Sequence, residues 1–326
     1  MSQQSVRPLN PVPEEFAGAS LSRGLKRAFH ATRPKFYPAS ILPVLVGSAW
    51  GAWAGAGFDV TVFVLALFAT VAVHAAANVL NDVGDETIGT DPRNEDRIYP
   101  YTGGSRFIQT GILPKDVMAR VGITLLAMAT AAGLALFALR GPAVFLFGLA
   151  GMLLGVLYSL GPIKLASLGL GETAVAIAFG VLPVTGAAWL QGAALDLPLV
   201  LFSLPVSAYV AAILLINEVP DMKPDSECGK NTLPVRLGLG GTAVLYFAIH
   251  LSAAAAVIVL TAMGKLPLAA PLGPLALLVL AWRASTAIRT GIADRPAMTQ
   301  AIEGTLAIHT IGCIWLTGCA LFAIWW

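Results

Sequence analysis

The chain has 326 residues, of which 57% are hydrophobic and only 12% are charged. Globular proteins carry about 25% charged residues, so this composition excludes an ordinary soluble class and indicates a membrane protein. The net charge of +2, without a basic run that contains aromatic residues, excludes nucleic acid as a partner. Three cysteines, Cys228, Cys313 and Cys319, match neither a disulfide framework nor zinc-ligand spacing, so we interpret them as packing residues.

The first 37 residues are polar, contain several prolines and lack the apolar core of a signal peptide. We expect residues 1–37 to form a cytoplasmic N-terminal segment and residues 38–326 to form a transmembrane domain. Apolar residues of the segment fall near one helical face and basic residues lie elsewhere: Phe16, Leu21, Leu25 and Phe29 against Arg23, Lys26 and Arg27. This pattern predicts a helix on the membrane surface, with a flexible tail as the alternative.

Apolar runs of about 20 residues, the length that a membrane-spanning helix needs, recur along the rest of the chain. Between polar breaks they define nine expected spans, at 38–56, 58–80, 117–139, 142–160, 170–190, 197–217, 240–263, 267–288 and 303–325. The sequence therefore predicts an all-α, polytopic membrane bundle of nine transmembrane helices.

The basic residues are distributed unevenly between the expected loops. Of the 20 lysines and arginines, 18 lie in the N-terminal segment or in the loops that follow the second, fourth, sixth and eighth spans. The two exceptions are Arg140 and Lys265. Positive charge concentrates on the cytoplasmic side of membrane proteins. The asymmetry therefore places the N-terminus in the cytoplasm. It also supports the count of nine spans, because a missed span would distribute the basic residues over both sides of the membrane.

Acidic residues crowd two loops on that same side. They are Asp82, Asp85, Glu86, Asp91, Glu95 and Asp96 after the second span, and Glu218, Asp221, Asp225 and Glu227 after the sixth. Both loops begin with the pattern Asn-acid-Val-x-Asp, from Asn81 to Asp85 and from Asn217 to Asp221. The match hints at an internal correspondence but is too short to establish a duplication.

Carboxylate and amide oxygens are the ligands that Mg²⁺ prefers, usually one or two per protein site with water and phosphate oxygens completing the shell. On a helix, Asn78, Asn81 or Asp82, and Asp85 share one face. Gly84 and Gly89 predict that this helix breaks, and Pro220 and Pro224 disfavour a regular helix at Asp221. The sequence predicts a Mg²⁺ site with candidate ligands Asn81, Asp82, Asp85, Asn217, Asp221 and Asp225, and it places Asp91 in the loop that follows.

Two facing acidic clusters cannot bind a diphosphate without cations between them. Like charges about 4 Å apart repel by roughly 4 kcal/mol at an effective dielectric constant of 20. Nearby basic side chains can bind the outer phosphate oxygens: Arg97, Arg106, Lys164, Lys230 and Arg236. A metal-bound diphosphate is a good leaving group, so an allylic C–O bond could ionise to a cation that an electron-rich aromatic ring captures.

At these residues the sequence resembles the UbiA-type intramembrane prenyltransferases. The resemblance covers most of the chain from Thr32 onward, and its motifs are Asn81-Asp82-x-x-Asp85 with Asp91, Asp221-x-x-x-Asp225 preceded by Asn217, Tyr158 to Lys164, and Thr32-Arg33-Pro34. It implies a helical bundle around a central cavity, Mg²⁺-dependent transfer of an isoprenoid from its diphosphate, and a lateral opening to the lipid bilayer. It also implies catalytic roles for Asp85, Asp221, Asp225, Lys164 and Tyr158, with Arg97, Arg106, Lys230 and Arg236 binding the diphosphate.

Within the superfamily, Gly103-Gly104-Ser105-Arg106 and the run from Gly229 to Gly238 are most similar to the 1,4-dihydroxy-2-naphthoate polyprenyltransferases of menaquinone synthesis. This implies a polyprenyl diphosphate donor, loss of CO₂ from the aromatic acceptor to give demethylmenaquinol, and a bacterial inner-membrane protein with its site on the cytoplasmic side. Gly89 departs from the broader pattern, in which an aspartate is common, and Asp91 is expected to substitute. The 4-hydroxybenzoate, haem O and chlorophyll branches stay open, because pocket shape sets ring specificity.

Two other classes use acid-rich membrane sites. CDP-alcohol phosphotransferases have Gly after the second aspartate, whereas Glu86 follows Asp85. Divalent-cation transporters place acids near the bilayer midplane, where these spans are almost free of them. Both alternatives fit less well. His74, seven residues before Asn81, could contact the aromatic substrate, but a hydrogen-bonded structural histidine is the interpretation that we prefer.

Overall fold

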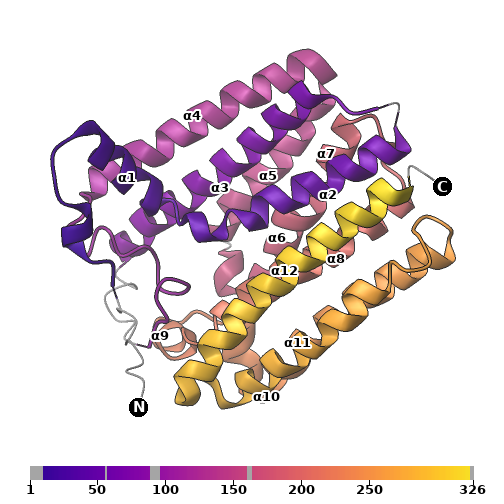
Figure 1. Ribbon diagram of the computed structural model, residues 1–326. Coiled ribbons are helices and arrows are strands. Elements are labelled where there is room, and N and C mark those ends of the chain that lie inside the picture. The colour runs from indigo at the N-terminus through magenta and orange to yellow at the C-terminus, as the bar shows by residue number, and fades with distance from the viewer. Residues whose placement is uncertain (1–9, 56, 89–95, 160–163, 324–326) are drawn as a thin grey trace.

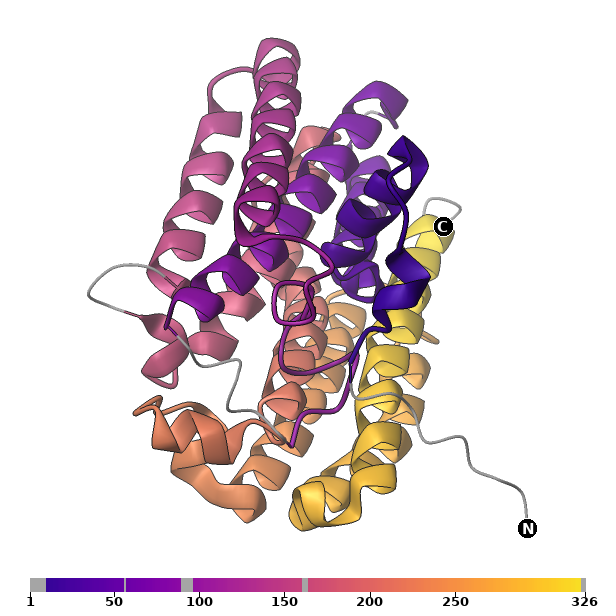
Figure 2. The same cartoon turned by 90° about the vertical axis from the view of Figure 1, so that its left-hand side faces the viewer.

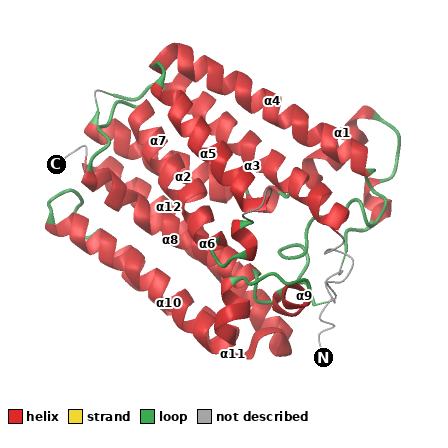
Figure 3. Cartoon of the chain, turned by 180° about the vertical axis from the view of Figure 1, so that it is seen from behind, coloured by secondary structure: helices red, strands yellow, loops and turns green. Residues whose placement is uncertain are grey.

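The computed structural model describes residues 10–55, 57–88, 96–159 and 164–323, and these residues form helices joined by loops, without strands (Figure 3). The α-helices are α1 (Leu21–Ala31), α2 (Pro38–Ala54), α3 (Val60–Ile88), α4 (Lys115–Arg140), α5 (Ala143–Ser159), α6 (Gly171–Val175), α7 (Leu182–Leu190), α8 (Leu197–Asn217), α9 (Met222–Glu227), α10 (Leu233–Ala262), α11 (Leu272–Thr290) and α12 (Arg295–Ala323). A π-helix, η5 (Ala176–Val181), joins α6 to α7. Short 3-10 helices are η1 (Pro13–Phe16), η2 (Pro34–Phe36), η4 (Leu165–Ser167) and η6 (Gly291–Asp294).

The all-α class is confirmed, but the count of nine spans is not. Each predicted apolar range overlaps a helix or the continuous series of α6, η5 and α7. Within the described ranges, however, only six helical stretches are long and apolar enough to cross a membrane. The difference arises because α2 and α5 have 17 residues each, and because α11 and α12 fall within one 52-residue stretch, Leu272–Ala323.

The loops gather at two ends of the bundle. At one end, called here the site end, the side chain of Asp82 accepts a hydrogen bond from the backbone N–H of Ser105 (3.0 Å), and Asn231 N–H donates to the Ser167 carbonyl (3.0 Å). The site end lies on the left in Figure 1, with α1, α9 and the start of α12, and Figure 2 faces it. The described parts of both acidic loops therefore lie at the same end.

At the opposite end, one arginine ties three helix ends together. Arg140, the last residue of α4, forms an ion pair with Asp59 (2.7 Å) and donates from Nε to the carbonyl of Leu190 (2.8 Å). Gln191 adds bonds to the backbone N–H and carbonyl of Asp59 (2.7 and 3.1 Å). Lys265 lines a pocket with Ala54 and Ala194, near Leu190 and Gln191, so the two basic residues that the sequence placed apart from the rest both lie at this end.

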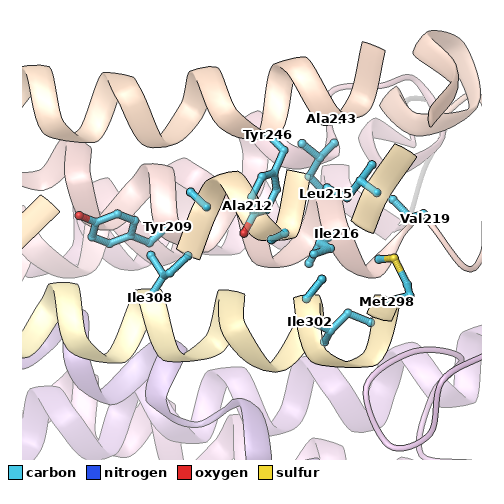
Figure 4. Close-up of a cluster of buried hydrophobic side chains, with 14 of the residues drawn as sticks. Tyr209, Ala212, Leu215, Ile216, Val219, Ala243, Tyr246, Met298, Ile302 and Ile308 are labelled. Carbon is cyan, nitrogen blue, oxygen red and sulfur yellow. The ribbon is translucent and has the colours of Figure 1, made fainter. Parts of the chain in front are cut away.

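Helix α8 lies at the centre of the bundle and is the most buried of the long apolar helices in the described chain. Its Tyr209, Leu215 and Ile216 pack against Tyr246 of α10 and Ile302 of α12 (Figure 4). The outer helices α3, α4, α5 and α10 instead expose large apolar side chains. Because apolar area in water costs about 25 cal/mol per Å², this outer surface suits a lipid environment.

Glycines allow α2 and α7 to approach each other closely. An ideal Cβ on Gly47 would lie 2.2 Å from the carbonyl oxygen of Val184, and one on Gly51 would lie 2.6 Å from that of Ala188. Both distances are too short for any side chain. The four-residue spacing of these glycines is the small-residue pattern that brings membrane helices into backbone contact.

Gly47→Ala is therefore expected to destabilise the protein by about 1–3 kcal/mol, the usual cost of overpacking a core. Gly133→Ala in α4 is the matched control, because its Cβ would meet nothing within 4 Å. Thermal unfolding of the purified protein in detergent should show a lower Tm for the first variant only. Equal Tm values for both variants would contradict the contact between α2 and α7.

The N-terminal segment contains the predicted amphipathic helix, with one difference. In α1, Leu21, Leu25 and Phe29 form an exposed apolar face. Phe16 does not belong to this face, because it lies in η1 and packs its ring against Phe107, with 4.9 Å between the ring centroids. Location of α1 on the membrane surface stays a prediction.

The two cysteines of α12, Cys313 and Cys319, are buried and unbonded, as a packing role predicts.

Candidate active site

The first acidic cluster lies on the last turns of α3. Helix α3 continues to Ile88, so the predicted break at Gly84 is wrong. An ideal Cβ at Gly84 would meet nothing within 4 Å, so no neighbouring group requires a bend there. The helical spacing brings Asn81 Nδ2 to within 2.8 Å of Asp85 Oδ2, to which it donates. Asn78 donates from Nδ2 to the Thr32 carbonyl (3.0 Å), which ties the N-terminal segment to this helix.

Asp82, predicted as a metal ligand, has protein partners on both carboxylate oxygens. The Arg33 guanidinium forms an ion pair with Oδ1, and the Ser105 backbone N–H donates to Oδ2. Asp82 is only 2% exposed, and a buried carboxylate of this kind requires such partners. Metal ligation by Asp82 stays a prediction, since each oxygen keeps a second lone pair beside its protein partner.

Two arginines at the site end have left-handed backbone conformations. Arg33 has φ 57° and Arg106 has φ 65°. For residues other than glycine this region costs roughly 1–2 kcal/mol, so tertiary contacts must hold both residues in place. Arg106 follows Gly103 and Gly104, whose positive φ angles shape the loop, and it is buried beside Ser105. Arg33 was not among the predicted site residues, although its motif carried part of the family resemblance.

The second cluster follows the end of α8. Asp221 precedes α9, and its carbonyl accepts a hydrogen bond from Asp225 N–H (2.9 Å), so the expected four-residue relation exists despite the two prolines. Lys230 Nζ lies 3.4 Å from Asp225 Oδ1. The side-chain oxygen of Asn217 is buried and has no hydrogen-bond partner among the described residues. This orphaned oxygen at the head of the cluster is suited to a cation.

Electrostatic interactions show that the two clusters face each other. Burial raises the pKa of Asp225, Lys230 partly offsets this, and the charge of Asp85 from the first cluster raises the pKa further. Burial alone would lower the pKa of Lys230, but Asp225, Asp85 and Asp221 together raise it. The site end thus brings residues more than 130 positions apart into one charged cluster.

Tyr158, at the end of α5, lies within electrostatic range of that cluster, including Asp85 and Asp225. This places the predicted catalytic tyrosine beside the two acidic groups. Lys164, its predicted companion, is exposed where the described chain resumes before η4.

Two of the predicted diphosphate-binding arginines make other contacts. Arg97 is buried and donates to the Asn10 side chain, while its own carbonyl accepts from Arg295. Arg236 is exposed, and its Nε donates to the Asn231 carbonyl (2.9 Å). Diphosphate binding by these residues stays a prediction. Asp91 lies outside the described residues.

The donor set suits a hard divalent cation without forming a complete protein cage. Among residues that the structure describes, no three His, Cys, Asp or Glu side chains lie close enough to hold a metal ion. The available donors are the amide oxygens of Asn81 and Asn217 and the carboxylates of Asp85, Asp221 and Asp225. Mg²⁺ takes few protein ligands and fills its shell with water and phosphate oxygens, so these residues fit it.

Two buried glutamates beside Tyr158 were not predicted as site residues. Glu172 of α6 is 4% exposed and Glu218 is 9% exposed. Burial raises the pKa of Glu218 well above its usual range, and Glu172 raises it further. The sequence held a signal for Glu172, because an acid within the apolar run 170–190 is rare and functional by default.

His74 is a structural histidine, as interpreted from the sequence. Its Nδ1 shares a 2.5 Å hydrogen bond with Ser40 Oγ, and its ring packs edge-on against Phe179 of η5 (4.8 Å between centroids).

Comparisons with known proteins identify the family and support the fold. Residues 40–302 match the model of the UbiA prenyltransferase family. A 1,4-dihydroxy-2-naphthoate octaprenyltransferase from Haemophilus influenzae is 33% identical over 248 residues, which are 72% of this chain and 76% of that protein. The apo structure of a UbiA homologue from Aeropyrum pernix has a TM-score of 0.64 at 19% identity, covering 88% of this chain and 96% of that one. The structure of a UbiA homologue from Archaeoglobus fulgidus bound to GPP and Mg²⁺ has a TM-score of 0.58 at 16% identity, covering 89% of this chain and 99% of that one.

The helical bundle, with two acidic clusters at one end and large apolar side chains exposed on its outer helices, indicates a multi-pass membrane protein with a charged site. The chain belongs to the UbiA prenyltransferase family and is a prenyltransferase.

Replacement of Asp85, Asp221 or Asp225 by alanine should each lower turnover roughly a hundredfold or more, because each removes a charge that faces the cation. Folding should be retained, since none of the three is a core residue. Asp116→Ala is the control, because this exposed aspartate pairs only with exposed Arg120. Near-normal turnover in the Asp85 and Asp221 variants would refute a site made from two clusters.

Proposed function

We propose that this prenyltransferase transfers a polyprenyl group from its diphosphate to 1,4-dihydroxy-2-naphthoate, with loss of CO₂, and so makes demethylmenaquinol in menaquinone biosynthesis. The observation that carries the proposal is the convergence of Asp85 and Asp225 with Lys230 in one charged cluster. The name of the Haemophilus relative supports 1,4-dihydroxy-2-naphthoate as the acceptor. The GPP and Mg²⁺ bound in the Archaeoglobus structure support a prenyl diphosphate as the donor.

The two clusters would hold Mg²⁺ from opposite sides. Asn81 and Asp85, with Asp82 and Asp91 as further candidates, would contribute from the α3 side, and Asn217, Asp221 and Asp225 from the α8 side. When bound, Mg²⁺ supplies the positive charge that neutralises a diphosphate and makes it a good leaving group.

Basic and phenolic side chains would hold the diphosphate itself. Lys230 stays protonated because the surrounding carboxylates raise its pKa, so its ammonium can donate to phosphate oxygens. Arg106, buried and held in place by its loop, is suited to a fixed contact, whereas exposed Arg236 and Lys164 could bind outer oxygens. Arg97 is assigned to the same group. The Tyr158 hydroxyl, within electrostatic range of Asp85 and Asp225, would donate to the departing diphosphate.

The acceptor chemistry balances without an external oxidant or reductant. The allylic C–O bond breaks and its electron pair leaves with the diphosphate. A π pair of the electron-rich ring then forms the new bond to the allylic carbon at the carboxyl-bearing position. The pair of the C–CO₂⁻ bond returns to the ring, CO₂ departs, and aromaticity is restored.

We assign the site end to the cytoplasmic side of a bacterial inner membrane, because the sequence places almost all basic residues there. Single cysteines at position 93 and at exposed Ser226 should both label from the cytoplasm, whereas Leu268→Cys, at the opposite end, should label from outside. The background is the chain with Cys228 replaced by Ser. Labelling of positions 93 and 226 from opposite faces would contradict the site.

The acceptor is tested with substrate that carries an isotopic label on the carboxyl carbon. Labelled CO₂ should appear in step with prenylated product and diphosphate when membranes containing the protein are given a polyprenyl diphosphate and Mg²⁺. A parallel reaction with 4-hydroxybenzoate is the control. A product that retains the carboxyl label would move the assignment to the hydroxybenzoate branch.

A further inference from the structure

Two carboxyl groups remain beside the site after the roles above are assigned. Glu172 lies in α6, Glu218 directly follows α8, and these two helices pack against each other at the site end. Both side chains are more than nine-tenths buried. The two carboxyl groups share a side-chain hydrogen bond with each other. Their other oxygens, Glu172 Oε1 and Glu218 Oε2, are buried and have no hydrogen-bond partner in the described part of the chain.

The surroundings of this glutamate pair are aromatic and apolar. Tyr158 lies within electrostatic range of both glutamates. An ideal Cβ on neighbouring Gly171 would be 3.7 Å from the Tyr158 ring and 3.6 Å from the Leu214 side chain. The helix that carries Glu172 continues directly into the π-helix η5, an element that is frequent at functional sites. The pair thus lies at a corner formed by α5, α6 and α8.

Buried carboxyl oxygens without partners are costly, so a folded protein retains them where a ligand supplies the missing donor. The protein's own nearby cation does not serve this purpose. Lys230 contacts Asp225, and the charges that act on it come from Asp225, Asp85 and Asp221. The diphosphate offers only acceptor oxygens and negative charge, which a carboxyl pair repels. Ring hydroxyls of the aromatic acceptor are therefore the donors that fit.

We propose that Glu172 and Glu218 accept a hydrogen bond from a ring hydroxyl of the aromatic acceptor and hold the ring beside the diphosphate site. This inference rests on the proposed prenyl transfer and extends it to the class of acceptor, a hydroxylated aromatic acid. The Tyr158 ring and Leu214 supply the flat apolar surface that such a ring packs against, and the carboxyl pair fixes its orientation.

The experiment measures steady-state kinetics of the full-length protein and of the isosteric variants Glu172→Gln and Glu218→Gln. Each variant should raise the KM for dihydroxynaphthoate roughly fivefold to a hundredfold, the range for a buried polar group that loses its hydrogen-bond partner. The KM for the polyprenyl diphosphate and the Mg²⁺ concentration for half-maximal activity should change by less than about twofold. Glu227→Gln, an exposed glutamate of α9, is the matched control.

Analogues identify the hydroxyl that is bound. The two naphthoates that each lack one hydroxyl are used as competitive inhibitors against the wild type and Glu172→Gln. The wild type should bind one of them at least tenfold more weakly than it binds the dihydroxy compound, and the variant should lose that preference. Glu172→Asp, which keeps the acceptor oxygens but shortens the side chain, should give an intermediate KM and serves as the second variant if Glu172→Gln does not fold.

Two results would overturn the inference. One is an unchanged acceptor KM in both glutamine variants. The other is a raised Mg²⁺ requirement with unchanged acceptor KM, which would make the pair cation ligands instead. A wrong assignment of the acceptor can be distinguished from a wrong role of the glutamates, because it is detected with the wild-type protein alone. If the wild type uses 4-hydroxybenzoate, the KM for that acid is compared between the wild type and the glutamine variants, and this comparison decides the role of the glutamates.

Discussion

The buried carboxylate of Asp82 joins three separate parts of the chain at the site end. It belongs to α3, pairs with Arg33 of the N-terminal segment and accepts from Ser105 of the loop that precedes α4. Loss of one partner from a buried ion pair costs about 3–5 kcal/mol, so these parts are held as a unit. The position of Arg106, directly after Ser105, depends on this contact, as does the docking of the N-terminal segment beside the first acidic cluster.

Around that anchor the site contains more acidic than basic groups. Asp85, Asp221 and Asp225 act on a single lysine, Lys230, and two more carboxyl groups are buried beside Tyr158. Such an excess of negative charge in an apolar bundle is stable only where cations or hydrogen-bond donors arrive with the ligands. For the proposed function, this excess of negative charge favours binding of metal, diphosphate and aromatic acceptor together over binding of any one alone.

Much of this arrangement could be predicted from the sequence, because membrane helices coincide with apolar runs and loops rich in basic residues lie on the cytoplasmic side. That reasoning put Asp85 and Asp225 at one end, and the structure confirms that they lie there. The partner of Asp82 could not be predicted, because Arg33 lies 49 positions earlier and their pairing depends on how the N-terminal segment folds back. Glu172 could have been noticed as an acid within an apolar run, but its pairing with Glu218 could not, because it depends on the packing of α6 on α8. The break expected at Gly84 did not form because glycine permits a bend without requiring one.

The π-helix η5 has a consequence for how insertions and deletions are tolerated. An α-helix advances about 100° per residue, so the angular relation between its two ends is set by its length. The segment from α6 through η5 to α7 must satisfy two unrelated partners, since Glu172 faces the end of α8 while Val184 and Ala188 must meet the glycines of α2. The wider turn at Ala176–Val181 supplies the rotation that reconciles them. Deleting one residue there would turn one half of the segment relative to the other, so this short stretch should have an invariant length even where its side chains vary.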